Sequence, residues 1–308
     1  MKVLVTGGSG FVGRQIVRQL HEAGHAVRLL VRRPRSRRVQ EAVLSWGAEV
    51  CPGDMLKPAS LAGAVAHSDA VIHLVGIISE AGKSTFENVH ITGTRNVVAA
   101  AQEACVLRFI HMSALGTRPN AASRYHRTKW AAEEMLRHSG LHFTIFRPSL
   151  IYGPEDQFIS LFAKLVRLSP VVPLLGNPQA RFAPVPVEAV ATAFVRSLGE
   201  PRAIGQTYDL CGPEALRLSE IVDRIEEVLG KRRCKLHVPL GLARGQAALL
   251  EFIFPHLLRQ APPLNRDQLV MLQEGNVGNG SPATDQFGLQ MGPLREGIAR
   301  YVGVKRKT

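Results

Sequence analysis

The sequence predicts an α/β fold in which a doubly wound parallel sheet is followed by a smaller C-terminal α/β lobe. Short apolar runs alternate with helical patterns over the first two-thirds of the 308 residues, which is typical of strands joined by helices. A glycine-rich turn separates the first strand from the first helix, and after about Gly153 the alternation loosens as prolines recur. We therefore expect residues 1–154 to form the core, and residues 155–308 to complete the sheet and form the smaller lobe.

The predicted strands are short apolar runs bounded by turn residues, and the predicted helices show an apolar residue every three to four positions. Ala70–Val75 is almost entirely apolar, as expected of a parallel strand that is covered on both faces. Gly24 is the expected stop signal of the first helix. The predicted strands are Val3–Thr6, Ala26–Val31, Glu49–Cys51, Ala70–Val75, Arg108–Met112 and His142–Arg147. The predicted helices are Val12–Glu22, Phe86–Ala104, Arg124–His138 and Leu218–Leu229.

The chain is strongly basic: 38 Lys and Arg residues against 25 Asp and Glu residues give a formal net charge of +13. Such an excess favours anionic partners such as phosphates, nucleic acid or an acidic lipid surface. Six arginines lie between Arg28 and Arg38. Aromatic residues make up only 6% of the chain, so a surface for stacking bases is not indicated and nucleic acid is not the expected partner.

The spacing of cysteine and histidine does not indicate a metal site. The four cysteines are scattered and form no CxxC pair, which is typical of reduced intracellular thiols. His21 and His25 have the spacing of metal ligands on a helix, but Gly24 is expected to end the helix between them. The first strand begins directly after Met1 and no apolar run reaches the ~20 residues of a spanning helix, so we expect a cytoplasmic protein. Peripheral attachment to the inner face of the membrane is the alternative.

Glycines recur at three-residue spacing between the first strand and the first helix. Gly7, Gly10 and Gly13 form a GxxGxxG pattern, which allows a tight turn and the close approach of a pyrophosphate to the main chain. The helix that follows would present free N–H groups and a partial positive charge to the phosphates. The sequence therefore predicts a Rossmann-type dinucleotide site rather than an ordinary glycine-rich turn. The residues expected to bind the nucleotide here are Thr6, Gly7, Ser9, Gly10, Phe11, Val12 and Gly13.

The residues after the second strand indicate which dinucleotide binds. NAD-binding sites usually have Asp or Glu at this place, where the carboxylate holds the ribose 2′-hydroxyl. Here Arg32 and Arg33 follow the strand, and the first carboxylate is that of Glu41. A guanidinium pairs with a 2′-phosphate that a carboxylate would repel. We therefore predict that NADP(H) is preferred over NAD(H), with Arg32 as the first candidate and Arg33 as the second. The alternative is that these arginines form a solvated basic face.

Residues at the ends of later strands complete the predicted nucleotide-binding set. Asp54 follows the third strand, and two roles are open for it: accepting a hydrogen bond from the adenine amino group, or capping the next helix. The other members of the set are Met55, Leu74, Val75, Gly76 and Pro148, together with Tyr125 and Lys129.

Four motifs in the first half of the chain together resemble the extended short-chain dehydrogenase/reductase superfamily. They are the turn Thr6–Gly13; Asn88 with Gly93-Thr94-Arg95-Asn96; Tyr125 and Lys129 at YxxxK spacing; and Arg147–Pro154. Other segments are similar to an atypical branch of this superfamily, which includes the Rossmann-like accessory subunit of respiratory complex I and its bacterial relatives. Those segments are Ser123–Tyr125, Tyr152–Phe158, Pro184–Val187, Tyr208–Pro213 and Leu240–Leu264.

The resemblance implies a catalytic tyrosine, lysine and serine. Tyr125 would be the general acid or base. Lys129 lies on the same helix face, where its ammonium would lower the pKa of the phenol and hold the nicotinamide ribose. The third member would be Ser113, at the end of the fifth strand. Ala114, however, aligns with the place where the family serine usually lies, so the resemblance implies nucleotide binding and leaves turnover open.

Three functional hypotheses follow from these expectations. The first is a nucleotide-holding accessory or assembly protein that binds NADPH and turns over little. The second is an active NADPH-dependent reductase, or an epimerase/dehydratase acting on a sugar-nucleotide or quinone-like substrate through Tyr125 and Lys129. The third is a redox sensor that reports the NADPH/NADP ratio to a partner.

The apolar stretch Leu240–Leu264 is the candidate partner surface. Its apolar residues include Phe252, Phe254 and Leu257, and they lie close in sequence to basic residues such as Arg244. This composition suits a helix packed on the smaller lobe, and it also suits docking to an anionic membrane surface or a hydrophobic protein partner. The sequence leaves both interpretations open.

Overall fold

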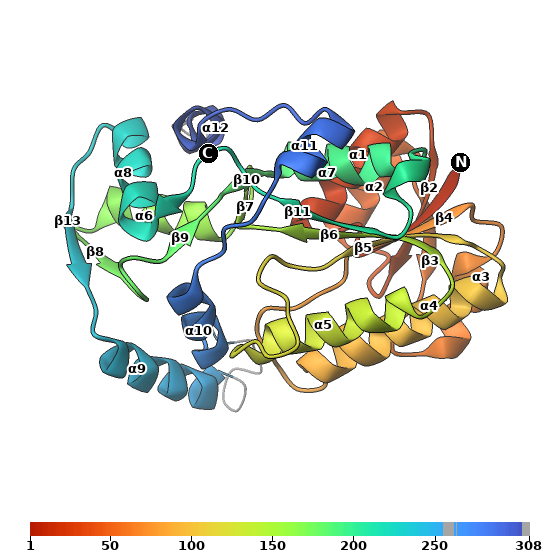
Figure 1. Ribbon diagram of the computed structural model, residues 1–308, viewed down its shortest axis with the longest axis horizontal. Coiled ribbons are helices and arrows are strands. Elements are labelled where there is room, and N and C mark those ends of the chain that lie inside the picture. The colour runs from red at the N-terminus through yellow and green to blue at the C-terminus, as the bar shows by residue number, and fades with distance from the viewer. Residues whose placement is uncertain (255–261, 263, 304–308) are drawn as a thin grey trace.

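A seven-stranded, fully parallel sheet forms the centre of the protein (Figure 1). The computed structural model describes residues 1–254, 262 and 264–303. The strand order is β11-β6-β5-β4-β1-β2-β3, so the direction in which strands are added reverses between β1 and β4, and this is the place where doubly wound sheets bind ligands. The strands are β1 (Lys2–Thr6), β2 (Ala26–Val31), β3 (Glu49–Pro52), β4 (Ala70–His73), β5 (Arg108–Met112), β6 (His142–Pro148) and β11 (Gln206–Leu210).

The predicted strands are confirmed, with small differences at their ends. The bounds of β2 and β5 are as predicted, whereas β4 ends at His73 rather than at Val75. The edge strand β11 had no strong signal, because Gln206, Thr207 and Asp209 interrupt its apolar pattern. Pairing with β6 nevertheless satisfies its backbone groups at the edge of the sheet.

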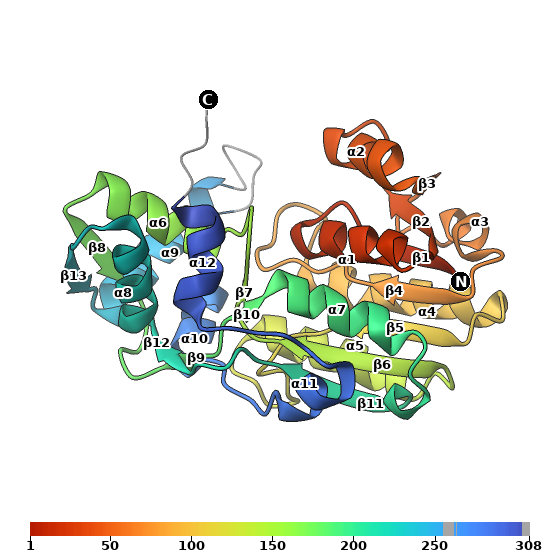
Figure 2. The ribbon, with the colours of Figure 1, turned by 90° about the horizontal axis from the view of Figure 1, so that it is seen from above.

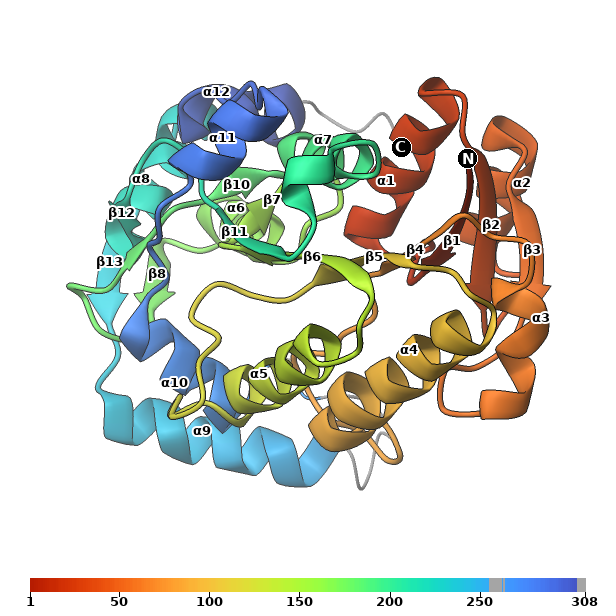
Figure 3. The same cartoon turned by 45° about the vertical axis from the view of Figure 1, so that its right-hand side comes forward.

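Helices cover both faces of this sheet (Figure 3). Successive side chains of a strand point to opposite faces, so Val3 and Val5 of β1 enter one core while Leu4 enters the other. One face carries α1 (Phe11–Glu22), α2 (Arg37–Trp46), α7 (Val187–Ser197) and α11 (Ser281–Phe287). The other carries α3 (Ala62–Val65), α4 (Gly93–Glu103) and α5 (Arg124–Arg137).

The predicted helix Phe86–Ala104 is divided in the structure. A π-helical segment, η2 (Glu87–Thr92), precedes α4, which begins at Gly93. Such wide turns occur mostly near functional sites. Here the segment brings Val89 to the cavity described below and packs the His90 ring against that of Tyr125.

The smaller lobe lies beside the carboxyl ends of the central strands (Figure 2). Its core is shared by α6 (Phe158–Leu168), α8 (Leu218–Leu229) and α12 (Leu294–Val302), and the bounds of α8 are as predicted. Short strands pair around these helices: β7 (Ile151–Tyr152) with β10 (Val185–Pro186), β8 (Val171–Leu174) with β13 (Cys234–His237), and β9 (Arg181–Phe182) with β12 (Leu216–Arg217). The short 3₁₀ turns are η1 (Pro58–Ser60) and η3 (Pro201–Ala203).

The predicted partner segment Leu240–Leu264 is described only in part. It contains α9 (Leu240–Ile253), which buries Ala243 and Ala247 and exposes Leu242, and it is followed by α10 (Arg266–Glu274). Of the residues considered for docking, Leu257 lies outside the described residues, as does the side chain of Phe252. Among the helices described, none has the length and apolar character needed to span a bilayer.

Candidate functional site

A cavity of about 880 Å³ opens at the carboxyl ends of the central strands, between the sheet and the smaller lobe. Its volume is within the range of small-molecule and cofactor sites, ~300–1,000 Å³. It extends across the point where the strand order reverses, since both Thr6 at the end of β1 and Leu74 after β4 line it. Most predicted nucleotide-binding residues line this cavity: Thr6, Gly7, Ser9, Gly10, Phe11, Val12, Gly13, Arg32, Asp54, Met55, Leu74, Val75, Gly76, Tyr125 and Pro148.

The glycine turn has the shape that a diphosphate requires. Gly7 adopts a left-handed backbone conformation with φ +78°, and Gly10 caps the N-terminus of α1. A Cβ on Gly13 would lie 2.2 Å from the carbonyl oxygen of Gly7, so only glycine allows the helix to begin so close to the turn. The free N–H groups of the first helical turn then face the cavity, and the residues beside them include Gly7, Gly10 and Gly13. Because glycines have no side chain, a phosphate group could come close to these N–H groups.

The arginines in and after β2 differ in their positions relative to the cavity. Arg32, Arg33 and Arg38 are all exposed, but only Arg32 and Arg38 line the cavity. Arg28 is buried and donates to the carbonyl oxygens of Gly63, Ala64 and Ala66, so its role is structural. Arg38 was not predicted as a site residue, because it belongs to α2 rather than to the residues directly after the strand.

Asp54 lies at the cavity and also takes part in a local turn. Its Oδ1 accepts a hydrogen bond from the backbone N–H of Leu56 at 3.0 Å, and its own N–H donates to Ser60 Oγ at 3.0 Å. Asp54 therefore stabilises the loop after β3. It does not cap the next helical turn, because Lys57 is the residue that precedes that turn. Because the residue also lines the cavity, a role toward adenine stays a prediction.

Tyr125 is buried at the cavity wall and surrounded by aromatic rings. It makes edge-on contacts with His90 and Phe86, at 5.3 and 6.0 Å between ring centroids. The prediction that the pKa of its phenol is lowered is wrong: burial raises it well above the ordinary value, and the carboxylate of Asp267 raises it further. The phenol of this structure therefore keeps its proton at neutral pH.

Lys129 lies behind the cavity wall formed by Gly76. A Cβ on Gly76 would be 3.0 Å from Lys129 Nζ, so glycine leaves the ammonium within reach of the cavity. Nζ donates to the carbonyl oxygen of Met112 at 2.9 Å. Burial lowers the pKa of Lys129 to about 8, and Glu133 opposes this shift. Lys129 is not among the residues that line the cavity, but it lies next to Gly76, which does line it.

Both Ser113 and Ala114 line the cavity after β5. The Ser113 side chain is only 3% exposed, and its Oγ lies 3.4 Å from Thr117 Oγ1. The backbone N–H of Ser113 donates to Phe146 on β6, which continues the pairing of the two strands beyond Met112. Ser113 and Tyr125 therefore line the same cavity, while Ala114 presents only a methyl group there.

The buried histidines near Lys129 were not singled out in the sequence analysis. His73 joins three elements, because Thr6 Oγ1 lies 2.7 Å from its Nδ1 and Thr94 Oγ1 lies 3.2 Å from its Nε2. His90 accepts from the N–H of Ile77 at 3.1 Å. Burial, and next the charge of Lys129, lowers the pKa of His73 to about 3 and that of His90 to about 2. These rings are therefore neutral in the folded protein at neutral pH. Their signal in the sequence was weak, since single histidines in apolar runs are common in cores.

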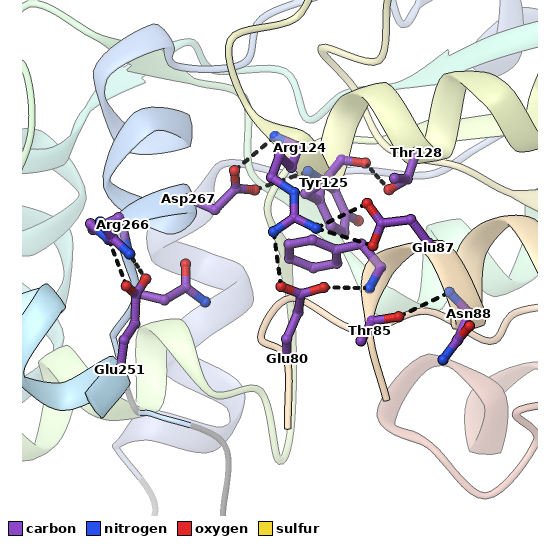
Figure 4. A network of polar contacts seen from close by, with 12 residues as sticks. Glu80, Thr85, Glu87, Asn88, Arg124, Tyr125, Thr128, Glu251, Arg266 and Asp267 are labelled. Atoms are coloured by element: carbon purple, nitrogen blue, oxygen red, sulfur yellow. Dashed lines mark hydrogen bonds and ion pairs between the residues drawn. The ribbon is translucent and has the colours of Figure 1, made fainter. Parts of the chain in front are cut away.

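Asp267 of α10 binds the N-terminus of α5, the helix that carries Tyr125 and Lys129 (Figure 4). Its carboxylate accepts from the backbone N–H groups of Arg124 at 2.7 Å and Tyr125 at 3.0 Å, and from Ser123 Oγ at 2.8 Å. A carboxylate at this place satisfies free N–H groups and interacts favourably with the helix dipole. The C-terminal region thus fixes the orientation of the helix.

No metal site is visible in the described part of the chain, where no three His, Cys, Asp or Glu side chains are grouped to bind an ion. The four cysteines are free.

Curated proteins of known name are similar to most of the chain. Subunit 9 of the NADH dehydrogenase [ubiquinone] 1 alpha subcomplex of Arabidopsis thaliana is 28% identical over 278 residues, which are 89% of this chain and 68% of that protein. The photosystem II assembly factor Ycf39 of Synechocystis is 27% identical over 94% of this chain and 86% of its own. The ceramide reductase of Caulobacter vibrioides is 35% identical over 63% of this chain and 59% of its own.

A solved structure with the same fold is the NADPH-dependent quinone oxidoreductase of Escherichia coli complexed with NADPH, with a TM-score of 0.76 and 18% identity. The alignment covers 97% of this chain and 99% of that one. At this identity the likeness concerns the fold. A family model described as NAD(P)H-binding matches residues 7–161, just over half of the chain, and this range contains the glycine turn, Tyr125 and Lys129. The chain therefore belongs to the NAD(P)H-binding family, and its similarity to the complex I subunit agrees with the resemblance to an atypical branch of the short-chain dehydrogenase/reductases.

Proposed function

We propose that this protein binds NADP(H) in preference to NAD(H) and acts as a nucleotide-holding accessory or assembly factor. One observation carries the proposal: the glycine turn at the start of α1 and the side chains of Arg32 and Arg38 line one continuous cavity. A diphosphate against the main-chain N–H groups of the turn would place an adenosine 2′-phosphate toward these guanidinium groups.

The remaining residues of the cavity suit the other parts of the nucleotide. Met55 and Leu74 offer apolar surface to a ring, and Asp54 keeps one carboxylate oxygen for an adenine amino group. Gly76 leaves access to the Lys129 ammonium, which could donate to ribose hydroxyls. When bound, the nicotinamide would supply hydride transfer.

The environment of Tyr125 favours holding over turnover. Its phenol has a raised pKa, and the Lys129 ammonium that would favour the phenolate donates instead to the carbonyl oxygen of Met112. The similarity to a complex I subunit and to a photosystem assembly factor supports the same role, because both are named as parts or builders of larger complexes. Protein partners are therefore part of this proposal.

The second candidate is an active reductase, and the far end of the cavity favours an apolar substrate for it. Tyr125 and Ser113 line the same cavity as the glycine turn. Among the described lining residues from the smaller lobe there is no Lys or Arg to bind the diphosphate of a sugar nucleotide. Instead, this end is apolar, with Phe158, Leu161, Phe162, Phe182, Leu218 and Met271. A quinone-like or long-chain carbonyl substrate suits this lining better.

The nucleotide preference can be tested by calorimetric titration of the full-length protein with NADPH and NADH. We expect NADPH to bind about tenfold or more tightly, because a bidentate charge-assisted contact is made with the 2′-phosphate alone. Arg32→Ala should bring the NADPH affinity down toward that of NADH. Arg33→Ala is the matched control, since Arg33 has the same charge, is exposed and lies outside the cavity lining. Equal affinities of the wild type for both nucleotides would remove the claim of preference.

Turnover is tested separately with the nucleotide-loaded protein. The near-ultraviolet absorbance of bound NADPH is followed after addition of quinones and long-chain carbonyl compounds. A holding role predicts that the absorbance persists. A decay that is abolished by Tyr125→Phe, without loss of NADPH binding, would establish the reductase instead.

A further inference from the structure

Glu155 places a carboxylate at the arginine end of the cavity. The residue lies in the loop between β7 and α6, more than a hundred positions from the arginines after β2, and it lines the cavity together with Arg32 and Arg38. The absence of a carboxylate directly after β2 was the sequence argument for NADP(H). The fold supplies a carboxylate at this end from another segment.

Glu155 forms ion pairs with two arginines at once. Its Oε2 accepts from Arg38 Nη2 at 3.0 Å, and Arg14 Nη1 donates to both carboxylate oxygens at 3.0 and 3.1 Å. Arg14 has a second partner, Glu41, at 2.6 Å, whereas Glu155 is the only acidic partner of Arg38 among the described residues. The carboxylate thus occupies the guanidinium of Arg38 that the cavity would otherwise offer to a phosphate.

The loop holds Glu155 in a defined position. Its backbone φ is +75°, which is in the left-handed region. A residue other than glycine adopts this conformation at a cost in free energy, and residues of this kind are frequent at functional sites. The next residue, Asp156, is buried and anchors the loop: it accepts hydrogen bonds from the N–H of Ser160 at 3.1 Å and from Tyr301 Oη at 2.7 Å. The carboxylate is therefore directed at Arg14 and Arg38 by a fixed loop rather than by a free side chain alone.

We infer that Glu155 sets the nucleotide selectivity of the cavity by competing with the 2′-phosphate for Arg38. This inference rests on the proposed function, because it assigns a residue within the same nucleotide site. Without nucleotide, Arg38 is paired with Glu155. With NADP(H), Arg38 transfers to the 2′-phosphate, which has more charge than a carboxylate and accepts two N–H bonds from one guanidinium, while Glu155 stays paired with Arg14. NAD(H) has no group that would draw Arg38 away.

The expected size of the effect is modest. The Glu155 side chain is 36% exposed and that of Arg38 is 52% exposed, so their ion pair is partly screened by solvent. Breaking a pair of this kind corresponds to about a two- to fivefold change in an equilibrium constant. Glu155 therefore reduces the preference for NADP(H) without abolishing it.

The test compares the dissociation constants of NADPH and NADH for the full-length wild type and for Glu155→Gln. The glutamine keeps the size of the side chain and removes its charge. We expect NADPH to bind about two- to fivefold more tightly to the variant, while the NADH constant changes less than about twofold. In an Arg38→Ala background the same substitution should no longer change the NADPH/NADH ratio, because the group for which Glu155 competes is gone.

Glu41→Gln is the matched control. It removes the same charge from a partner of Arg14, but Glu41 does not line the cavity, and among the described residues it forms no ion pair with Arg38. An equal gain from this control, or an equal gain for both nucleotides with Glu155→Gln, would overturn the inference, because the effect would then be one of net charge or of the diphosphate. An unchanged ratio with Glu155→Gln also overturns it. If the wild type binds neither nucleotide, the proposed function itself fails.

Discussion

Gly13 shows how a single hydrogen atom in place of a methyl group decides both the fold and the site. A Cβ at this position would lie 2.2 Å from Gly7 O and 2.7 Å from Gly8 Cα. Both neighbours are backbone atoms of the same tight turn, so neither can move aside without opening the turn. Gly10 is different: its Cβ would lie 3.2 Å from Gly7 O and the residue faces the cavity. Gly13 is therefore required because no side chain fits against the turn. Gly10 has more room, and its lack of a side chain instead leaves space for a ligand in the cavity.

Gly13→Ala should destabilise the folded protein by about 1–3 kcal/mol and weaken NADPH binding together with stability. Urea denaturation of the protein without nucleotide measures the first effect, and calorimetry measures the second. Gly63→Ala is the control, because a Cβ there has no atom within 4 Å and the residue lies within α3. That variant should be unchanged or slightly more stable. Equal stability of the two variants would contradict the packing argument.

At the scale of elements, α5 depends on α10. The segment from Asn265 to Asp267 contacts two other segments: Asn265 Nδ2 donates to the carbonyl oxygen of Ile78, and Asp267 accepts from the first N–H groups of α5. Arg124, the first residue of α5, forms ion pairs with Glu80 and Glu87 (Figure 4). The start of α10 thus holds both the loop after β4 and the helix α5, which carries Tyr125.

Asp267→Ala should cost about 2–3 kcal/mol of stability, because two backbone N–H groups and one hydroxyl lose a charged acceptor. The same change should lower the pKa of Tyr125, since the carboxylate is one of the two causes that raise it. Denaturation with urea checks the stability, and ultraviolet titration of the phenol checks the pKa. Asp285→Ala on the exposed side of α11 is the control and should change stability by less than about 0.5 kcal/mol. A Tyr125 pKa that does not fall would contradict the electrostatic role of Asp267.

At the scale of the whole molecule, the fold keeps basic groups of β4, β5 and η2 out of water. His73, His90 and His111 are buried near Lys129, and burial lowers the pKa of each. The folded state therefore keeps these rings neutral at a pH where the unfolded chain binds protons. The free energy of unfolding is therefore highest above about pH 6.5. It decreases as the pH falls from 6.5 toward the pKa values of about 3 and 2 of His73 and His90.

We expect the free energy of unfolding to fall between pH 7.5 and pH 5 by about 2 kcal/mol for each of His73 and His90. Urea denaturation at both pH values measures the fall. In His73→Gln the free energy of unfolding should fall by about 2 kcal/mol less over this pH range than in the wild type, whatever the stability of the variant at pH 7.5. His138→Gln controls for the loss of an imidazole at the surface. A pH dependence that is the same in His73→Gln and in the wild type would show that folding does not lower the pKa of His73.

The sequence alone determined those features that depend on neighbours along the chain. The turn Gly7–Gly13, the strands β2 and β5, the helix α8 and the common face of Tyr125 and Lys129 all follow from local sterics or from the 2.0 and 3.6 residue periods. Arg32 was found because it directly follows a strand. Most of the predicted nucleotide-binding residues line one cavity, because the carboxyl ends of parallel strands meet at one edge of the sheet.

Only the tertiary structure decided which distant groups meet. Arg38 and Glu155 are 117 positions apart and Tyr125 and Asp267 are 142 apart, and no local pattern joins either pair. The direction of the Tyr125 pKa shift was wrongly predicted for the same reason: burial and a carboxylate from α10 act on the phenol, and neither is encoded in the YxxxK spacing. Electrostatic interactions depend on distance and solvent exposure in space, and the fold determines both.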